Sequence, residues 1–450
     1  MIKRIHIQLL ALIAILCYPN NLRAGDYSLA PSTGRKVYVP IHAKSAKAQL
    51  LITNYGRDEV KDFDYKVLFE GKVLLEGKYV LKEPLKHMWG THAEIDVPPH
   101  DRLSETELQV EITKVNGEPN RASYPYAGLI RATVTQVAHR RVVVEEYTGM
   151  WCQYCPRGIA VMENLEKNYP DDFIGIAIHR RPDPLSCPDY AWNSFEAKGT
   201  PHLDMNRSRL LSNFTATTEF EEERAMGADM DVNVTAQWDE KKECITVTPS
   251  VTFRVVPKDT KYSVAYVLTE DGMTKPEWLQ NNRYSGDNSV LGKSPEMDKF
   301  VNSPSVVSGI LNNFTAIAAT GVYIPAREGE VQGVYTPGPE DFVKIPIEVD
   351  QTQSFQHVFN IAYNRLLQDK SKLKICVLLI NNNTKKIENA AKCTITDAGA
   401  TGISTVTEEH GNNTETARYT LNGGRIQAPQ KGINIVKYGD GRVRKEIVTR

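Results

Sequence analysis

Two cysteines spaced three residues apart stand between a predicted buried strand and a predicted helix. The motif covers Trp151 to Pro156 and reads Trp-Cys-Gln-Tyr-Cys-Pro. An apolar run from Val142 to Tyr147 precedes it, and helical periodicity extends from Gly158 to Asn168 after it. Cysteines at a helix start are close enough to form a small-ring disulfide, and the unsatisfied N–H groups there favour a thiolate. The placement predicts redox chemistry, with Cys152 as an exposed nucleophile and Cys155 as a partly buried resolving cysteine.

The residues after the motif continue an alternation of strands and helices. Phe173 to Ile178 is a second apolar strand, of the kind found in parallel sheets. Residues 187–198 are predicted to be helical, a third strand follows, and Thr217 to Met226 forms a closing helix. Strand, helix, strand, helix, strand is typical of an α/β unit. The stretch between His179 and Thr200 predicts a short helical insertion that overhangs the cysteines.

This arrangement resembles the thioredoxin fold. The resemblance rests on the strand before the motif, the tryptophan before Cys152, the cysteine pair at a helix start, and Thr200-Pro201 before a further strand. It implies a cis bond at Pro201 opposite the disulfide, and a backbone edge at Thr200 that receives an extended substrate peptide. It also implies a buried acid that accepts a proton from the resolving cysteine. Glu146 matches that position, and Glu145 stays open as the alternative because strand alternation buries either one.

A narrower resemblance covers residues 142 to about 395. The run from Val144 to Pro156, together with Ala177-Ile178-His179, is similar to a Bacteroidetes outer-membrane-protein family of thioredoxin fold, named for its twenty-eight-kilodalton member. In that family a β-domain follows the thioredoxin unit. The run from Ile380 to Ala390 resembles the late strand pair of that β-domain. The resemblance implies a protein of the cell envelope.

Short alternating apolar and polar runs flank the central unit on both sides, and turn residues separate them. The pattern is typical of antiparallel sandwiches. Lys344 to Val349 is a predicted strand of the second sandwich, and residues 272–305, with many Asn, Ser, Gly and Pro, are predicted to form a long excursion from it. The predicted fold class is therefore an α/β thioredoxin-like domain flanked by two β-sandwich domains, mixed and β-rich overall. The predicted parts are a signal peptide over 1–24, an immunoglobulin-like sandwich over 25–138, the thioredoxin-like domain over 139–227, a β-sandwich over 228–397, and a linker with a short β tail over 398–450.

The N-terminus predicts export. Lys3 and Arg4 precede an apolar run from Ile7 to Tyr18 that is too short to span a membrane, and Ala24 offers a cleavage point. Cys17 ends this run, so lipidation there stays open as an alternative. The tail from Glu415 has two hairpin signals, at Asn422-Gly423 and at residues 439–441. Its runs Tyr419-Thr-Leu-Asn-Gly-Gly-Arg and Pro429-Gln-Lys-Gly-Ile-Asn-Ile-Val resemble, in shortened form, the tails of exported Bacteroidetes proteins, which in full length can act as sorting signals. The expected location is the periplasm, the outer membrane or the cell surface.

Charge and composition narrow the expected partners. The chain has 54 Lys and Arg against 55 Asp and Glu, for a net charge of −1. This balance gives no broad cationic field, so a nucleic-acid partner is not expected. Polar residues interrupt every internal apolar run, which excludes a multi-pass membrane protein. The expected partners are cysteine-containing protein substrates or an envelope redox partner, with peripheral envelope association, no organic cofactor and no prediction of oligomeric state.

The cysteine motif has further interpretations. The first hypothesis is an exported thiol–disulfide oxidoreductase or isomerase acting through Cys152 and Cys155. The second is a non-enzymatic surface or periplasmic binding protein in which the pair is an inert disulfide. A third is a metallochaperone, whose site would need His179 and Cys187 as further ligands. Trp151 either binds substrate or caps the core.

The other candidate residues have structural interpretations. His179 is expected to bond locally at a strand end, and Cys187 to be a buried or free thiol. Cys244 and Cys393, both in strand-like runs, are candidates for a disulfide. Cys376 lies between Ile and Val and is expected in a core.

Overall fold

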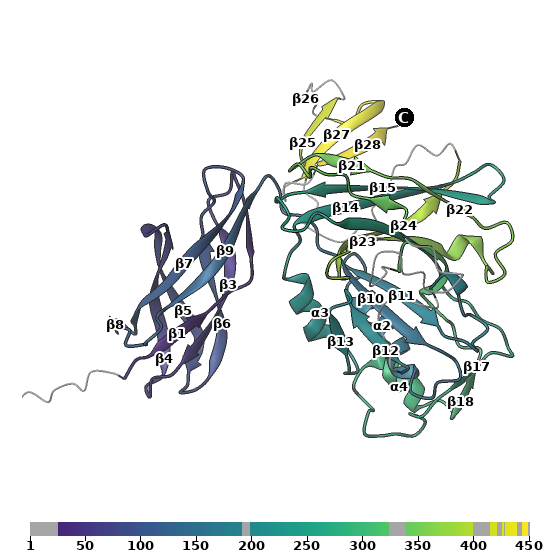
Figure 1. Ribbon diagram of the computed structural model, residues 1–450, viewed down its shortest axis with the longest axis horizontal. Coiled ribbons are helices and arrows are strands. Elements are labelled where there is room, and N and C mark those ends of the chain that lie inside the picture. Colours follow the sequence, from purple (N-terminus) through teal and green to yellow (C-terminus); the bar gives the residue numbers. More distant parts are fainter. Residues whose placement is uncertain are drawn as a thin grey trace, which may run out of the picture. The chain divides into compact units, whose positions relative to one another are not determined.

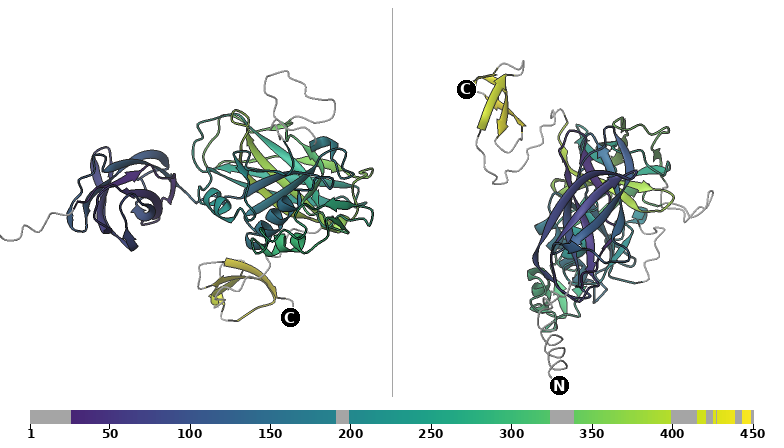
Figure 2. Two further views of the ribbon diagram at one scale, coloured as in Figure 1. Left: turned by 90° about the horizontal axis from the view of Figure 1, so that it is seen from below. Right: turned by 90° about the vertical axis from the view of Figure 1, so that its left-hand side faces the viewer.

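The computed structural model describes residues 26–190, 199–323, 339–398, 415–420, 425–426, 428–438 and 443–448. The predicted signal peptide with Cys17, residues 191–198 of a predicted helix, and most of the predicted linker lie outside the described residues. The chain divides into two compact units after Ala398. Strands are far more extensive than helices in the described residues (Figures 1 and 2).

The first unit opens with a two-sheet sandwich, which the alternating sequence pattern predicts. Period-two alternation buries one face of each strand, and side chains such as Leu50, Phe63 and Val110 from both sheets form one core. One sheet contains β1 (Leu29–Ser32), β3 (Ala46–Asn54) and β6 (Gly90–Val97), and the other contains β2 (Val37–Pro40), β4 (Val60–Phe69), β5 (Lys72–Leu85), β7 (Ser104–Val115), β8 (Glu118–Pro119) and β9 (Tyr126–Val134).

The rest of the first unit is built on one 13-stranded sheet. Its main path runs β13-β12-β10-β11-β19-β16-β23-β24-β14-β15-β21, with β20 paired to β16 and β22 paired to β15. The strands are β10 (Val142–Thr148), β11 (Phe173–His179), β12 (His202–Met205), β13 (Arg209–Leu211), β14 (Met230–Trp238), β15 (Cys244–Phe253), β16 (Tyr262–Glu270), β19 (Thr315–Thr320), β20 (Asp341–Phe342), β21 (Thr352–Ser354), β22 (His357–Asn360), β23 (Leu373–Asn381) and β24 (Ile387–Thr396). The helices are α2 (Pro156–Asn168), η1 (Pro188–Tyr190), α3 (Thr217–Arg224), α4 (Pro295–Val301) and η2 (Lys370–Lys372).

Strands β10 and β11, which flank the cysteine motif, are parallel and buried on both faces. On one face, Val144 and Phe173 pack with residues of α2 and α3. On the other face, Val143 and Ile176 pack with residues of β16, β23 and β24. Their continuous apolar sequence follows from this position, because a helix layer covers one side and a strand layer covers the other.

The prediction of a thioredoxin-like α/β domain flanked by two sandwiches is wrong. An α/β domain carries helices on both faces of its sheet, whereas the described helices α2 and α3 pack on one face only. Strand β11 also pairs in parallel with β19, with Ala177 opposite Thr315. The sheet therefore runs from the cysteine motif directly into strands that were expected to form a separate sandwich. The described chain is β-rich and has no clear thioredoxin fold.

Strand β24 returns to β10, and two asparagines bridge them. The side chain of Asn206 accepts the N–H of Val143 at 2.9 Å, and its carbonyl accepts the N–H of Ile387 at 3.1 Å. The side chain of Asn389 accepts the N–H of Arg141 at 3.0 Å. Strands β10, β11, β19, β16, β23 and β24 therefore enclose a common apolar core.

The opposite faces of β16 and β23 pack against β14 and β15, with Tyr266 and Val377 meeting Val247 in a second core. A strand was also expected over residues 344–349, and none forms there. The Ile345–Pro346 bond is cis, and Ile345 is 67% exposed. Proline lacks the N–H that a ladder needs, so the apolar alternation of this stretch does not become a strand.

Residues 272–305, expected as a long excursion, form short elements together with the residues that follow them. Strands β17 (Leu279–Asn281) and β18 (Val306–Ser308) pair antiparallel. The hydroxyl of Ser294 accepts the N–H of Met297 at 3.0 Å and caps α4, whose first position is Pro295. This start signal is present in the sequence, but the surrounding Asn, Ser and Gly residues conceal it.

The second unit contains one antiparallel sheet in the order β26-β25-β27-β28. The predicted hairpin turns at Asn422-Gly423 and 439–441 lie outside the described residues. The strands are β25 (Glu415–Thr420), β26 (Arg425–Ile426), β27 (Gly432–Tyr438) and β28 (Val443–Val448).

Candidate functional site

Cys152 and Cys155 are joined by a disulfide at the start of α2, with their Cα atoms 5.4 Å apart. Cys155 is the residue before the first helical turn, and Pro156 fills the first helical position, where no N–H donor is needed. The N–H of Cys152 donates to the carbonyl of Gly149 at 2.9 Å, and the N–H of Gly158 donates to the carbonyl of Cys155 at 2.9 Å. The pair therefore lies on a tight turn that leads directly into the helix.

Both cysteines are buried. Cys152 exposes 5% of its surface and Cys155 exposes none, so the prediction of an exposed Cys152 is wrong. Trp151 and Tyr154, the neighbouring aromatic residues, are 45% and 47% exposed. Aromatic surface rather than sulfur is therefore what the motif presents to solvent.

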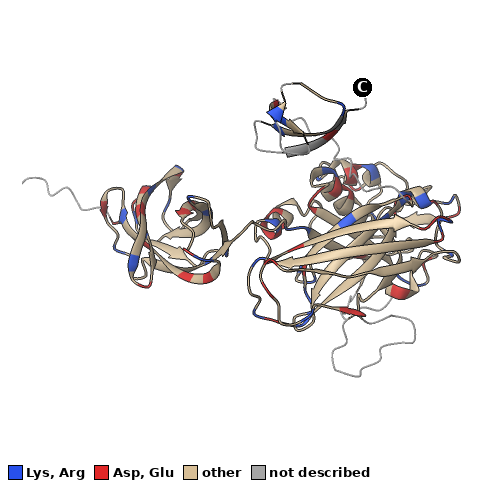
Figure 3. Ribbon diagram, turned by 90° about the horizontal axis from the view of Figure 1, so that it is seen from above, with Lys and Arg blue, Asp and Glu red and all other residues tan. Residues whose placement is uncertain are grey.

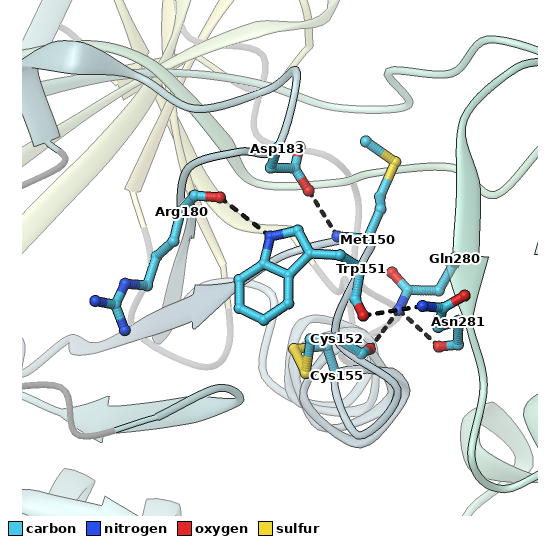
Figure 4. The surroundings of a disulfide bond; sticks show 8 residues. All are labelled: Met150, Trp151, Cys152, Cys155, Arg180, Asp183, Gln280 and Asn281. Carbon is cyan, nitrogen blue, oxygen red and sulfur yellow. Dashed lines mark hydrogen bonds between the residues drawn. A yellow bond between two sulfur atoms is a disulfide. The ribbon is translucent and has the colours of Figure 1, made fainter.

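The Thr200–Pro201 peptide bond is cis and directly precedes β12. Strand β12 pairs antiparallel with β10, with Tyr147 opposite His202. This register brings Thr200 and Pro201 to the end of β10 from which the motif loop departs. The indole N–H of Trp151 donates to the carbonyl of Arg180 at 3.3 Å (Figure 4).

The two adjacent acids of β10 face opposite sides of the sheet. Glu145 points into the core enclosed by the strands, where Arg207 holds it through two hydrogen bonds of 2.8 and 2.7 Å. The hydroxyl of Tyr190 also donates to Glu145. Arg207 and Glu145 are both almost wholly buried. Glu145 is therefore a structural ion-pair partner inside the core.

Glu146 points to the other side, against α2. A Cβ atom placed on Gly158 would lie 2.0 Å from Oε1 of Glu146, so the carboxyl group lies directly beneath the turn that follows the cysteines. Burial raises the pKa of Glu146 to about 7, although the hydroxyl of Thr148 and the charge of Arg157 lower it. The Oε1 atom has no hydrogen-bond partner. A carboxyl group of this kind can take up or release a proton near neutral pH.

A cavity of about 20 Å³ lies beside Glu146 and is also lined by His179. That space holds about one water molecule. The Nδ1 atom of His179 lies 3.2 Å from Oδ1 of Asp183, without hydrogen-bond geometry. Burial raises the pKa of Asp183, but His179 and the N–H groups of Met150 and Leu185 outweigh it and place the pKa below its usual value. Asp183 is therefore an anion that accepts the N–H of Met150 in the motif loop.

Residues 280–283, which we call the clamp segment, run beside the motif loop. Figure 4 shows Gln280 and Asn281 approaching its backbone from one side, with the Trp151 indole on the other. The carbonyl groups of four consecutive residues, 150–153, accept hydrogen bonds from this segment. The bonds are Asn281 N–H to Met150 at 2.9 Å, the Asn281 amide to Trp151 at 2.9 Å, the Gln280 amide to Cys152 at 2.9 Å, and Arg283 N–H to Gln153 at 2.8 Å.

Sequence reasoning missed the clamp segment. Gln280 and Cys152 are 128 residues apart, and residues 279–283 contain no local signal of a binding role. Only the fold of the excursion brings the two stretches together.

Four further cysteines are free thiols: Cys187, Cys244, Cys376 and Cys393. The candidate disulfide between Cys244 and Cys393 does not form, because β14 lies between β15 and β24. Burial raises the pKa of Cys187 to about 12 and that of Cys376 to about 11. Thiols with such pKa values are almost entirely protonated at neutral pH and react slowly.

Other classes of site find little support in the described part of the chain. It has no group of three or more His, Cys, Asp or Glu residues that could hold a metal ion. Basic and acidic residues are interspersed over the strands and loops (Figure 3). Its helices are all too short or too polar to cross a membrane.

Comparison with known proteins does not assign a family. No family model matches the chain, and no curated protein matches it. Among solved structures, HBP35 of Porphyromonas gingivalis is similar at 14% identity over 69% of this chain and 99% of that one, with a TM-score of 0.41. A protein of Agrobacterium tumefaciens is similar at 14% identity over 61% and 100%, with a TM-score of 0.34. A CARDB domain from Pyrococcus furiosus covers 25% of this chain and 97% of its own, at 14% identity and a TM-score of 0.19. Since each TM-score is below 0.5, the Bacteroidetes family remains a prediction.

Proposed function

We propose that this protein carries out thiol–disulfide exchange on cysteine-containing proteins through Cys152 and Cys155. The observation that supports it is a disulfide at a helix start, above a buried acid whose pKa is about 7. The helix start favours the Cys152 thiolate, and Glu146 is suited to take the proton of Cys155. Trp151, Thr200 and Pro201 are proposed to contact the substrate peptide.

In the reducing direction, the Cys152 thiolate attacks one sulfur of a substrate disulfide. The substrate S–S bond breaks, and its other sulfur leaves as a thiolate. Cys155 then loses its proton to Glu146 and attacks the Cys152 sulfur, which frees the second substrate sulfur and closes the protein disulfide. Two electrons pass to the substrate, and an external dithiol restores the reduced pair. In the oxidising direction the same steps run in reverse.

Turnover by cysteine variants tests this function. With a dithiol as electron donor, Cys152→Ser should abolish insulin reduction, and Cys155→Ser should accumulate mixed disulfides with substrate. Cys244→Ser is the matched control, because Cys244 is a free thiol in strand β15, and it should retain full activity. Insulin reduction that is unchanged in Cys152→Ser would overturn the proposal.

A second candidate is a non-enzymatic surface or periplasmic binding protein with an inert disulfide. The burial of both cysteines and the four bonds of the clamp segment favour it. The reduction potential separates the two functions. A value above about −230 mV indicates an oxidant or isomerase, a value near −270 mV indicates a reductant, and a value below about −300 mV indicates a structural disulfide.

We also propose that the protein acts outside the cytoplasm, where disulfides persist. Secretion of the full chain, with removal of residues 1–24, tests this location. A mass that retains the N-terminus in the mature protein would overturn it.

A further inference from the structure

We propose that Gln280 is a positioning residue for the Cys152–Cys155 pair, and that the clamp segment sets how readily this disulfide is reduced. The inference rests on the proposed function, since it names a determinant of the same site. It is carried by the hydrogen bonds from residues 280–283 to the carbonyl groups of residues 150–153.

Gln280 is the central contact of the clamp segment. The residue is 1% exposed, and its side-chain amide donates to the carbonyl of Cys152 at 2.9 Å and to that of Asn281 at 2.9 Å. A buried amide with two such bonds is held in one orientation, since breaking either bond leaves a polar group without a partner. The peptide group that follows the Cys152 Cα is therefore fixed from outside the motif.

This position bears on the redox equilibrium. After the S–S bond is cut, the two sulfurs stay within reach of each other only if the backbone of the loop remains in place. Cys155 lies on the helix start, whereas Cys152 lies on the loop that the clamp segment holds. A clamped loop keeps the effective concentration of one thiol toward the other high, which favours the disulfide. A released loop gains conformational freedom in the reduced state, which favours the dithiol.

Linkage separates positioning from ordinary structural support. A residue that merely stabilises the fold lowers the unfolding free energy of the oxidised and reduced proteins equally when it is removed. The redox equilibrium constant then stays the same, because it reports only the difference between the two effects. A positioning residue changes the two forms unequally and shifts the constant.

The experiment measures the equilibrium constant of the Cys152–Cys155 disulfide against a glutathione series, in the full chain. Gln280→Met keeps the side-chain volume and removes the donor, and it should make the disulfide about three- to tenfold easier to reduce. Asn281→Ala removes the bond to the Trp151 carbonyl and should shift the constant in the same direction by less. If the Gln280→Met protein does not fold, Asn281→Ala alone tests the positioning role of the clamp segment.

Asn364→Ala is the matched control. Its amide donates to the carbonyl of Ile317 in β19 at 2.9 Å, and its side-chain oxygen accepts the N–H of Leu366 at 2.9 Å. The change therefore removes an amide-to-carbonyl bond of the same kind at a place remote from the cysteines. It should lower stability without moving the redox constant. Constants for Gln280→Met and Asn281→Ala equal to that of the wild type, or a disulfide that becomes harder to reduce, would overturn the positioning role. Insulin reduction is read separately, so absent turnover together with a shifted constant would reject the proposed function and keep this inference.

Discussion

The two faces of strand β10 hold adjacent buried acids in opposite states. On the face toward the enclosed core, Glu145 is bound by Arg207 and Tyr190. On the face toward α2, Glu146 keeps an oxygen without a hydrogen-bond partner beside a one-water cavity. The comparison teaches that burial alone does not define a functional acid. A fully paired carboxylate maintains the fold, whereas a carboxyl group that keeps one oxygen without a partner and has a pKa near 7 is available for proton exchange.

The largest effect is expected at the paired face. Arg207→Met removes the cation and leaves Glu145 as an uncompensated buried charge, which should cost about 3–5 kcal/mol of unfolding free energy. Urea denaturation at pH 7 measures it. Arg209→Met is the control, because Arg209 and Glu222 form a pair of the same chemistry at 2.7 Å with side chains 41% and 45% exposed. The control should lose less than about 1 kcal/mol. Equal losses in both variants would contradict the assignment of Glu145 to the fold.

At the unpaired face the expected effect depends on pH. The pKa of Glu146 is raised to about 7 in the folded protein, against an ordinary value of 4.5 for a glutamate. The folded state therefore binds more protons than the unfolded state, and its contribution to stability falls as pH rises from about 4.5 to about 7. Glu146→Gln removes this dependence. The unfolding free energy of the variant minus that of the wild type should therefore be larger at pH 8 than at pH 4 by roughly 3 kcal/mol. Parallel pH profiles of the two proteins in urea denaturation would refute the raised pKa.

A sign reversal at Gly158 sharpens the same comparison. Gly158→Ala places a Cβ 2.0 Å from Oε1 of Glu146 and should destabilise the protein by roughly 1–3 kcal/mol. In a Glu146→Ala background the clash is gone, and the same change should stabilise the helix by up to about 1 kcal/mol, since alanine favours helix more than glycine. A double-mutant cycle by thermal or urea denaturation measures the coupling. Additive effects would show that Glu146 does not lie against the helix.

Local patterns predicted the elements around the motif and their order. The apolar runs became β10 and β11, the helical periodicity became α2, and the cysteines lie where strand and helix meet. These features depend on residues close in sequence, so the pattern contains them. The same pattern led to the wrong fold class, because it does not state which edge of a strand meets which other strand. Ala177 and Thr315 pair although they are far apart in the sequence, so no local pattern signals their pairing.

The candidate site divides in the same way. Alternation along β10 indicated that Glu145 and Glu146 face opposite sides, but it did not show which one faces the cysteines. That choice follows from Arg207 and Gly158, which lie on other elements. The contact of Gln280 with Cys152 likewise depends on the fold of an excursion more than a hundred residues away.

The smallest expected effect tests the group that tunes Glu146. The hydroxyl of Thr148 lowers the pKa of Glu146 against the raising effect of burial. Thr148→Val keeps the shape of this buried side chain and removes the hydroxyl, so the pKa of Glu146 should rise further, by less than about one unit. The midpoint of the pH-dependent stability difference between the Thr148→Val protein and the Thr148→Val, Glu146→Gln double variant measures this pKa. A midpoint that stays in place or moves to lower pH would show that the pKa of Glu146 is set by burial and Arg157 alone. The hydroxyl of Thr148 would then have no part in tuning this acid.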